Sequence, residues 1–213
     1  MKRYIIQLII LLNLLFSGVQ ATEWRVQHHL RMDFNAVWGS AANDVFAVGQ
    51  EGLIFHYDGS QWREMDTGMT NSEVFYHLRG IWGTSSTDVF VVGSYGTILH
   101  YDGNQWTTMN SGISTINLEG IWGTSSTDVF AVGRNGTILH YDGNQWTAMN
   151  SGISSPLLSV WGSSSNDVFA GGDGGILHYD GQQWTSMAGV TSSVTSLTSS
   201  GHSGYVGESA LPD

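Results

Sequence analysis

Histidine and aspartate recur at a fixed spacing in this 213-residue chain, in four segments that could supply proton-transfer groups or metal ligands. Each segment has an Asp-Val-Phe triplet, and a His-Tyr-Asp-Gly sequence whose histidine follows the first aspartate by 11 or 12 residues. The histidines are His56, His100, His140 and His178, and the triplet aspartates are Asp44, Asp88, Asp128 and Asp167. Because the four copies are alike, they predict a repeated structural role, whereas a catalyst needs one asymmetric site.

A single metal ion would need several imidazoles within ~4 Å of one point, but one histidine per repeat places them far apart. We therefore predict that each ring bonds either a backbone carbonyl or its own triplet aspartate, and that the aspartate caps backbone N–H groups of its loop. Calcium is the alternative use of these carboxylates, although no loop has a dense D-x-D-x-D spacing. The sequence predicts no metal site and no cofactor.

No catalytic motif stands out beside these repeats. The chain contains no G-x-S-x-G elbow, no Walker loop and no H-E-x-x-H. A sialidase-type site gathers several arginines on a carboxylate near a tyrosine nucleophile. Beyond the first 21 residues the arginines are Arg25, Arg31, Arg63, Arg79 and Arg134. We predict a non-catalytic binding scaffold for a protein or a glycan, with a glycosidase-class enzyme and a purely structural envelope protein as alternatives.

Tryptophan defines the repeat itself. The first tryptophan of each unit stands in [VI]-W-G-[ST], and two residues separate the second from His-Tyr-Asp-Gly. The first set is Trp38, Trp82, Trp122 and Trp161, and the second is Trp62, Trp106, Trp146 and Trp184. Four units result, over about 34–65, 78–109, 118–149 and 157–187.

Each unit predicts four short antiparallel strands. Asp-Val-Phe opens a β-branched and aromatic strand that is apolar on both faces, as a doubly buried strand requires. Between the second and third strands, two variable residues and a glycine predict a type I turn with a bulge. Between the third and fourth strands, Asp-Gly predicts a tight hairpin. Four-stranded units of ~40–45 residues indicate an all-β protein of the β-propeller class, with one unit per blade.

The first 21 residues predict a cleaved secretory signal peptide. Lys2 and Arg3 precede the apolar stretch Tyr4–Phe16, and V-Q-A ends at Ala21 before Thr22. Thirteen apolar residues are too few for a span of ~20. We expect a secreted or periplasmic propeller domain over 22–213, without a membrane span. That domain keeps five arginines, no lysine and 18 acidic residues, which argues against nucleic acid as a partner.

The stretch WGTSSTDVFVVGSYGTILHYDGNQWTTM (residues 82–109) resembles repeats of exported bacterial β-propellers, which are grouped with the BNR or Asp-box and the photosystem II assembly factor-like propellers. The resemblance covers Trp24–Met187 and extends to kelch and tectonin repeats. The Asp-box S-x-D-x-G-x-T-W is absent, because Gly103 directly follows Asp102. The Gly-Gly pair of kelch blades occurs only at Gly171-Gly172. The resemblance implies a propeller fold, in a group that includes glycosidases, assembly factors and lectins.

A binding surface is expected where the repeats differ from one another. In a propeller blade, the turn between the second and third strands lies on the same face as the connection to the next blade. The first such connection is four residues longer than the second. Aromatic, amide and charged groups suited to recognition are expected on this face. They are Glu73, Phe75, Tyr76, His77, Arg79, Tyr95, Asn117, Glu119, Arg134, Asn135 and Asp173.

The two ends of the domain predict how the ring closes. Trp24-Arg25-Val26 is similar to a fourth strand without its blade, and residues 194–213 are similar to a degenerate partial repeat. We predict that the N-terminal strand completes this fifth blade and gives a monomer. The alternatives are a truncated gene product and one arm of a larger ring that forms by self-association.

Overall fold

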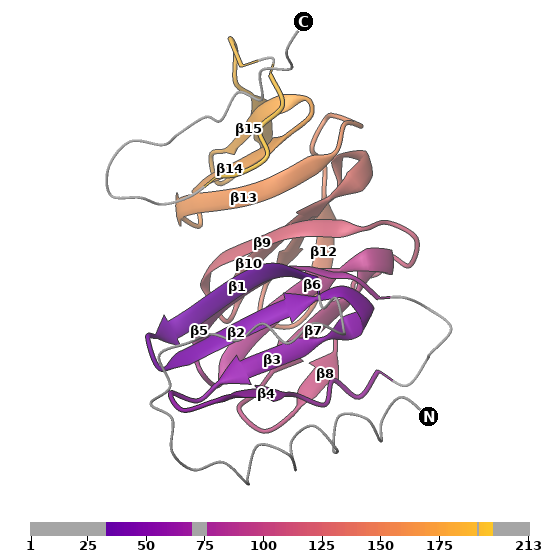
Figure 1. Cartoon of the computed structure of the whole chain (residues 1–213). Helices are drawn as coiled ribbons and strands as arrows, with labels where there is room; N and C mark the ends of the chain where they lie inside the picture. The colour runs from indigo at the N-terminus through magenta and orange to yellow at the C-terminus, as the bar shows by residue number, and fades with distance from the viewer. Residues whose placement is uncertain (1–32, 70–75, 191, 198–213) are drawn as a thin grey trace, which may run out of the picture. The chain divides into compact units, whose positions relative to one another are not determined.

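The computed structural model describes residues 33–69, 76–190 and 192–197, and these form four antiparallel sheets of four strands each (Figure 1). The predicted all-β fold class is confirmed. The signal peptide, Trp24, Glu73, Phe75 and residues 198–213 of the partial repeat lie outside the described residues.

Each sheet follows chain order, so that consecutive strands pair with one another. The first sheet contains β1 (Phe34–Ala41), β2 (Asp44–Gly49), β3 (Ile54–Tyr57) and β4 (Trp62–Glu64). The second contains β5 (Leu78–Ser85), β6 (Asp88–Gly93), β7 (Ile98–Tyr101) and β8 (Trp106–Thr108). The third contains β9 (Leu118–Ser125), β10 (Asp128–Gly133), β11 (Ile138–Tyr141) and β12 (Trp146–Met149). The fourth contains β13 (Leu157–Ser164), β14 (Asp167–Gly172), β15 (Gly175–Tyr179) and β16 (Trp184–Ser186).

The register is the same in all four sheets. The first tryptophan of each unit pairs with the phenylalanine of Asp-Val-Phe, as Trp122 does with Phe130. That phenylalanine pairs on its other side with the repeated histidine, as Phe130 does with His140. The identical sequence spacing therefore produces identical cross-strand neighbours.

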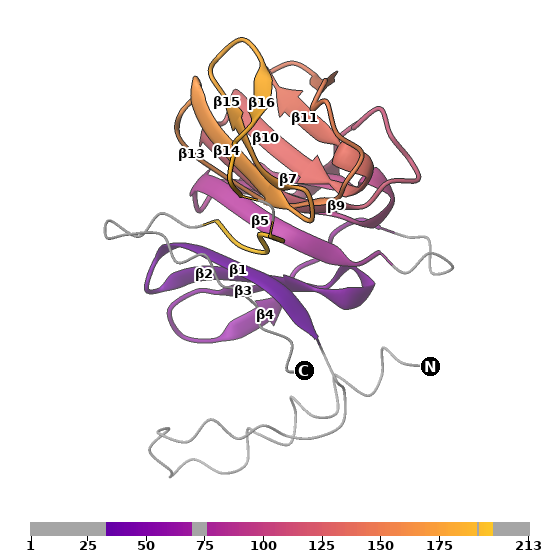
Figure 2. The same ribbon diagram turned by 90° about the horizontal axis from the view of Figure 1, so that it is seen from above.

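Neighbouring sheets pack face to face through their first strands, in the order β1, β5, β9, β13 (Figure 2). Three apolar clusters fill the junctions between them, and the phenylalanines Phe46, Phe90 and Phe130 are at most 1% exposed there. The glycine after each tryptophan makes this approach possible. A Cβ at Gly162 would lie 2.6 Å from Cη2 of Trp122, and Gly83 and Gly123 likewise face Trp38 and Trp82. Trp38, Trp82 and Trp122 thus each pack on the glycine of the next sheet.

The turns between second and third strands differ from the prediction. In the first three sheets the middle residue and the following glycine both have a positive φ, for example 58° at Tyr95 and 67° at Gly96. The N–H of the residue after the glycine donates to the carbonyl of the first turn residue, as Thr97 does to Ser94 over 3.1 Å. This is a type I′ arrangement, so the predicted type I turn with a bulge is wrong. The primed turn matches the twist of the two strands that it joins.

The Asp-Gly turns between third and fourth strands are built around the carboxylate. In each, one carboxylate oxygen accepts the N–H groups of the second and third residues after the aspartate, at 2.8–3.0 Å. These bonds, above all those from the glutamines, hold the aspartate pKa below its ordinary 3.8. The aspartates are Asp58, Asp102, Asp142 and Asp180.

These lowered pKa values predict acid sensitivity. The folded state favours the ionised form, so the stabilisation is complete above the ordinary pKa and is lost as the pH falls through the lower folded-state values. We expect the double variant Asp102→Asn, Asp142→Asn to lose less thermal stability than the wild type between about pH 5 and about pH 2. The amide oxygen still accepts the N–H bonds but does not titrate. Superimposable melting profiles of the two proteins would contradict this role.

Within the described part of the chain, we find no helix with the length and apolar character that crossing a bilayer requires.

Candidate functional site

The repeated histidines and aspartates form four equivalent pairs. The distance from histidine Nε2 to aspartate Oδ1 is 2.6 Å for His56 and His140 and 2.7 Å for His100 and His178. Of the two partners that the sequence left open, the structure shows the triplet aspartate. Each imidazole also stacks near the phenylalanine of its own unit, with ring centres 4.2–4.6 Å apart.

A hydroxyl completes each pair without creating a nucleophile. Ser40, Thr84, Thr124 and Ser163 donate to the second oxygen of the aspartate four residues later. In Ser-His-Asp catalysis the hydroxyl instead bonds the imidazole, which removes its proton. In the fourth sheet, the Ser163 hydroxyl and then His178 lower the pKa of Asp167. Each set of hydroxyl, aspartate and histidine therefore ties the end of the first strand and the start of the second strand to the third strand.

Metal binding finds no support in the part of the chain described. Among residues 33–69, 76–190 and 192–197, no group of three or more His, Asp or Glu side chains could hold an ion. The carboxylates of the repeated pairs already bond a hydroxyl and an imidazole.

The turns between second and third strands interlock with the connections between sheets, and together they form one surface, which we call the loop face. Gly52 N–H donates to the Tyr76 carbonyl at 2.6 Å, and Ser94 N–H donates to the His77 carbonyl at 2.9 Å. The same pattern continues along the chain, where the Gly96 N–H donates to Ile116 at 2.7 Å. The connections that carry the predicted residues are thereby fixed against the turns.

Asn117 joins two turns of the loop face. Its side-chain oxygen accepts the Tyr95 N–H at 3.2 Å, and its carbonyl accepts the Arg134 N–H at 3.0 Å. Tyr95 is held with a φ of 58° and is 51% exposed. An exposed aromatic ring therefore stands on a backbone that is fixed from both sides.

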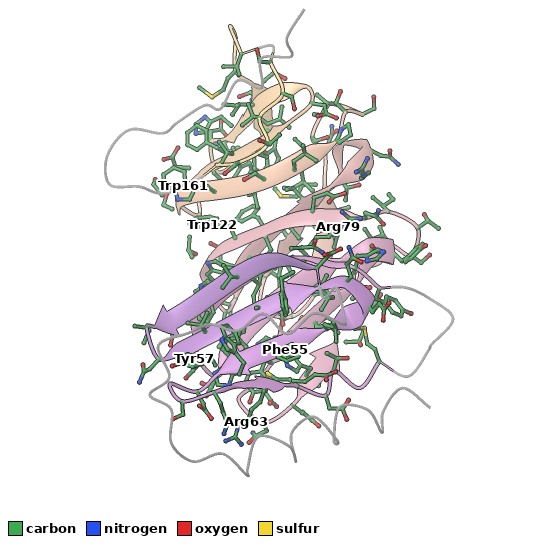
Figure 3. The ribbon with its side chains drawn as sticks, viewed as in Figure 1. Phe55, Tyr57, Arg63, Arg79, Trp122 and Trp161 are labelled. Atoms are coloured by element: carbon green, nitrogen blue, oxygen red, sulfur yellow. The ribbon has the colours of Figure 1, made fainter. Side chains whose placement is uncertain are left out.

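Next to this turn, two arginines share one carboxylate. Nη1 of Arg79 lies 3.1 Å from Oε2 of Glu119, and Nε of Arg134 lies 2.9 Å from Oε1 of the same residue. The Glu119 side chain is 10% exposed and that of Arg134 is 52% exposed. Arg79 (Figure 3) keeps its Nε buried without a hydrogen-bond partner. The cluster carries one net positive charge and has N–H groups left to donate.

The structure brings some of the predicted loop-face residues together and leaves others apart. The structure brings Arg79, Glu119 and Arg134 together, and it links Tyr95 with Asn117. Tyr76 and His77 contribute backbone carbonyls. Asn135 is an exposed turn residue with a φ of 58°, and Asp173 accepts the Ser193 hydroxyl at 3.0 Å.

Sequence reasoning placed the charged residues on one face but missed their pairing. The signal was present, because Arg79 and Glu119 occupy the same position in successive repeats, each before Gly-Ile-Trp-Gly. First strands of neighbouring sheets are adjacent, so opposite charges at one repeat position meet across the junction. The contact of Ser193 with Asp173 had no comparable signal.

Comparison with known proteins supports the fold. No family pattern and no curated protein matches the chain. A structure of YCF48 bound to D1 peptide superposes with a TM-score of 0.57 at 16% identity, over 72% of this chain and 52% of that one. YCF48 from Cyanidioschyzon merolae gives 0.57 at 15% identity, over 79% and 61%. The chain thus spans less than two thirds of either structure.

At such identities the similarity concerns the fold alone, and it agrees with the resemblance to photosystem II assembly factor-like propellers at that level. The sheet order, the shared register and the face-to-face packing through first strands are those of consecutive propeller blades. The described chain is therefore a β-propeller protein with four consecutive four-stranded blades.

Proposed function

We propose that this protein is a non-catalytic scaffold that binds a protein partner in extended form through its loop face. The observation that carries the proposal is the exposed Tyr95 ring, held by a fixed turn close to the cluster of Arg79, Glu119 and Arg134. Tyrosine and arginine are the residue types that most often dominate binding energy in protein interfaces. Because the backbone of Tyr95 is already fixed, ordering this residue on binding costs little backbone entropy.

The arginine cluster suits a partner that offers carbonyl or carboxylate oxygens. Two guanidinium groups share the nearly buried Glu119 carboxylate, so both are oriented before a ligand arrives. Arginine donates up to five hydrogen bonds from a rigid plane, and the contacts to Glu119 use only part of that capacity. A peptide backbone or an acidic side chain could accept the remainder.

The similarity to YCF48 supports a peptide as the partner class, since one YCF48 structure holds D1 peptide. A glycan is the alternative ligand, because tyrosine, amide and arginine groups also recognise sugars. The four His–Asp pairs support a scaffold over an enzyme, since their hydroxyls bond carboxylates and are not activated.

The proposal predicts that the loop face determines affinity. A peptide selected from a displayed library against the purified chain should bind Tyr95→Ala and Arg134→Ala at least about tenfold more weakly than the wild type, which corresponds to about 1.4 kcal/mol. Binding should be measured by calorimetry. Asn144→Ala is the matched control, because this exposed residue lies in a turn at the opposite ends of the strands.

Equal affinity of all four proteins would refute the assignment of the loop face. Failure to select any peptide, together with binding on a glycan array that Tyr95→Ala abolishes, would favour the glycan. Release of reducing sugar that depends on one carboxylate would favour the glycosidase alternative.

A further inference from the structure

The three junctions between neighbouring blades are built from the same contacts. The phenylalanine of the earlier blade reaches the tyrosine of the next, with ring centres 6.0 Å apart for Phe46–Tyr101 and 5.9 Å apart for Phe130–Tyr179. The first-strand tryptophan of the earlier blade packs on the glycine of the next. We call the side of a blade that supplies phenylalanine and tryptophan its trailing side, and the side that supplies glycine and tyrosine its leading side.

The leading side of the first blade has no neighbour among the described residues. Val37 is 68% exposed, whereas its equivalents Ile121 and Val160 are 8% and 6% exposed. Trp62 is 38% exposed, whereas the equivalent tryptophans of the other blades are 6–8% exposed. The atoms nearest to a Cβ at Gly39 belong to Asp44, Val45 and Ala41, so no tryptophan lies on this glycine. Phe55 and Tyr57 belong to the same side (Figure 3).

The trailing side of the fourth blade has the residues that face a leading side in the three existing junctions, and it is also partly uncovered. Phe169 is partly exposed, whereas the equivalent phenylalanines are at most 1% exposed. Its ring contacts are Trp161 and His178 of its own blade. Met187, next to this side, is 42% exposed. Among the described glycines, none packs on Trp161 as Gly162 packs on Trp122.

We propose that these two sides dock on each other in two copies of the chain, head to tail, so that Trp161 of one copy packs on Gly39 of the other. The contact would extend the pattern of the three existing junctions, with the same residue types in the same positions. It would bury Val37 and Trp62 of one copy against Phe169 of the other. Two copies are the smallest assembly in which every such side is paired.

A short segment of the chain partly covers the trailing side and has to move. Val194 is 3% exposed and lies against Gly171 of the fourth blade. Its position corresponds to that of Leu118, which packs on the second blade, and of Leu157, which packs on the third. Residues 192–197 form no strand, and Leu197 is held by a hydrogen bond to Ser159. Phe34 of a docking copy would replace Val194, because it is the first-blade equivalent of these leucines.

Sedimentation equilibrium of the purified chain over a wide concentration range tests the proposal. We expect the wild type to associate, and Val37→Glu to sediment as a single copy because a carboxylate would be buried in the junction. Val37 is mostly exposed within one copy, so the circular dichroism spectrum should not change. Thr107→Glu, on the exposed outer strand of the second blade, is the matched control and should associate like the wild type.

Two further variants test the orientation and the role of Val194. A mixture of Val37→Glu with Trp161→Asp should form a one-to-one dimer, because each retains one intact side. Val194→Asp should associate at least as strongly as the wild type, because it weakens the competing segment. Any one of four results would overturn the proposal. The wild type stays a single copy, Val37→Glu still associates, the mixture does not associate, or Val194→Asp loses association. The last result would mean that Val194 takes part in the association and does not compete with it.

Discussion

Phe130→Ala is expected to reduce the free energy of unfolding by about 3–5 kcal/mol. The side chain is 1% exposed and contacts rings from two blades, including Trp122 at 6.4 Å, His140 at 4.4 Å and Trp184 at 6.2 Å between ring centres. Truncation leaves a cavity that both blades line, and neither can collapse into it without losing its own register. Equilibrium unfolding in urea, followed by tryptophan fluorescence, measures the loss.

Phe169→Ala is the matched control for this prediction. Phe169 has the same sequence context and the same cross-strand partners, but its side chain remains partly exposed. Both variants are made in the Val37→Glu background and measured at a concentration where that background is a single copy. There, Phe169→Ala should lower the free energy of unfolding clearly less than Phe130→Ala does. Equal losses would show that the stabilisation comes from within a blade and not from the junction.

Gly162→Val is the second change with a large expected effect. A Cβ at Gly162 would lie 2.6 Å from Cη2 of Trp122 and 2.7 Å from the backbone oxygen of Asp167. Its φ is not positive, so the cost is purely steric. Because backbone cannot move away as a side chain can, we expect the free energy of unfolding to fall by about 3 kcal/mol, the upper end of the range for overpacked cores. The same denaturation experiment detects it.

A double-mutant cycle separates the two clashes at Gly162. In a Trp122→Ala background the indole clash is absent, so Gly162→Val should cost less there than in the wild type. The contact with Asp167 oxygen remains, and so does part of the penalty. Strictly additive losses would mean that Trp122 does not pack on this glycine.

Most of the fold can be predicted from the repeat alone. Two tryptophans per unit, Asp-Val-Phe and Asp-Gly each define a local element, and four copies allow one unit to be checked against another. The turn at Tyr95 was predicted wrongly because its backbone depends on strand twist, while glycine at the third position fits either turn type. Nothing in the sequence requires a tyrosine to adopt a positive φ.

The candidate site was predictable in location but not in its bonds. The loop face follows from strand order alone, which is why Arg79, Tyr95 and Arg134 were placed on it. The shared carboxylate of Glu119 depends on how closely first strands approach, and the glycines that permit this approach act between blades. The unequal burial of Trp62 and Trp106 likewise depends on a neighbour that one repeat sequence does not describe.

The packing of each tryptophan on the glycine of the next blade has a consequence for how such a chain can change in evolution. Every repeat carries one tryptophan for the next blade and one glycine for the tryptophan of the blade before it. Insertion or deletion of a complete repeat therefore recreates the same junction at the new boundary. Insertion or deletion of half a repeat would leave one tryptophan without a glycine to pack on and one glycine without a tryptophan. Tandem duplication of whole units, as the identical segments Gly96–Thr107 and Gly136–Thr147 record, is therefore the route along which the number of blades can vary without rebuilding any core.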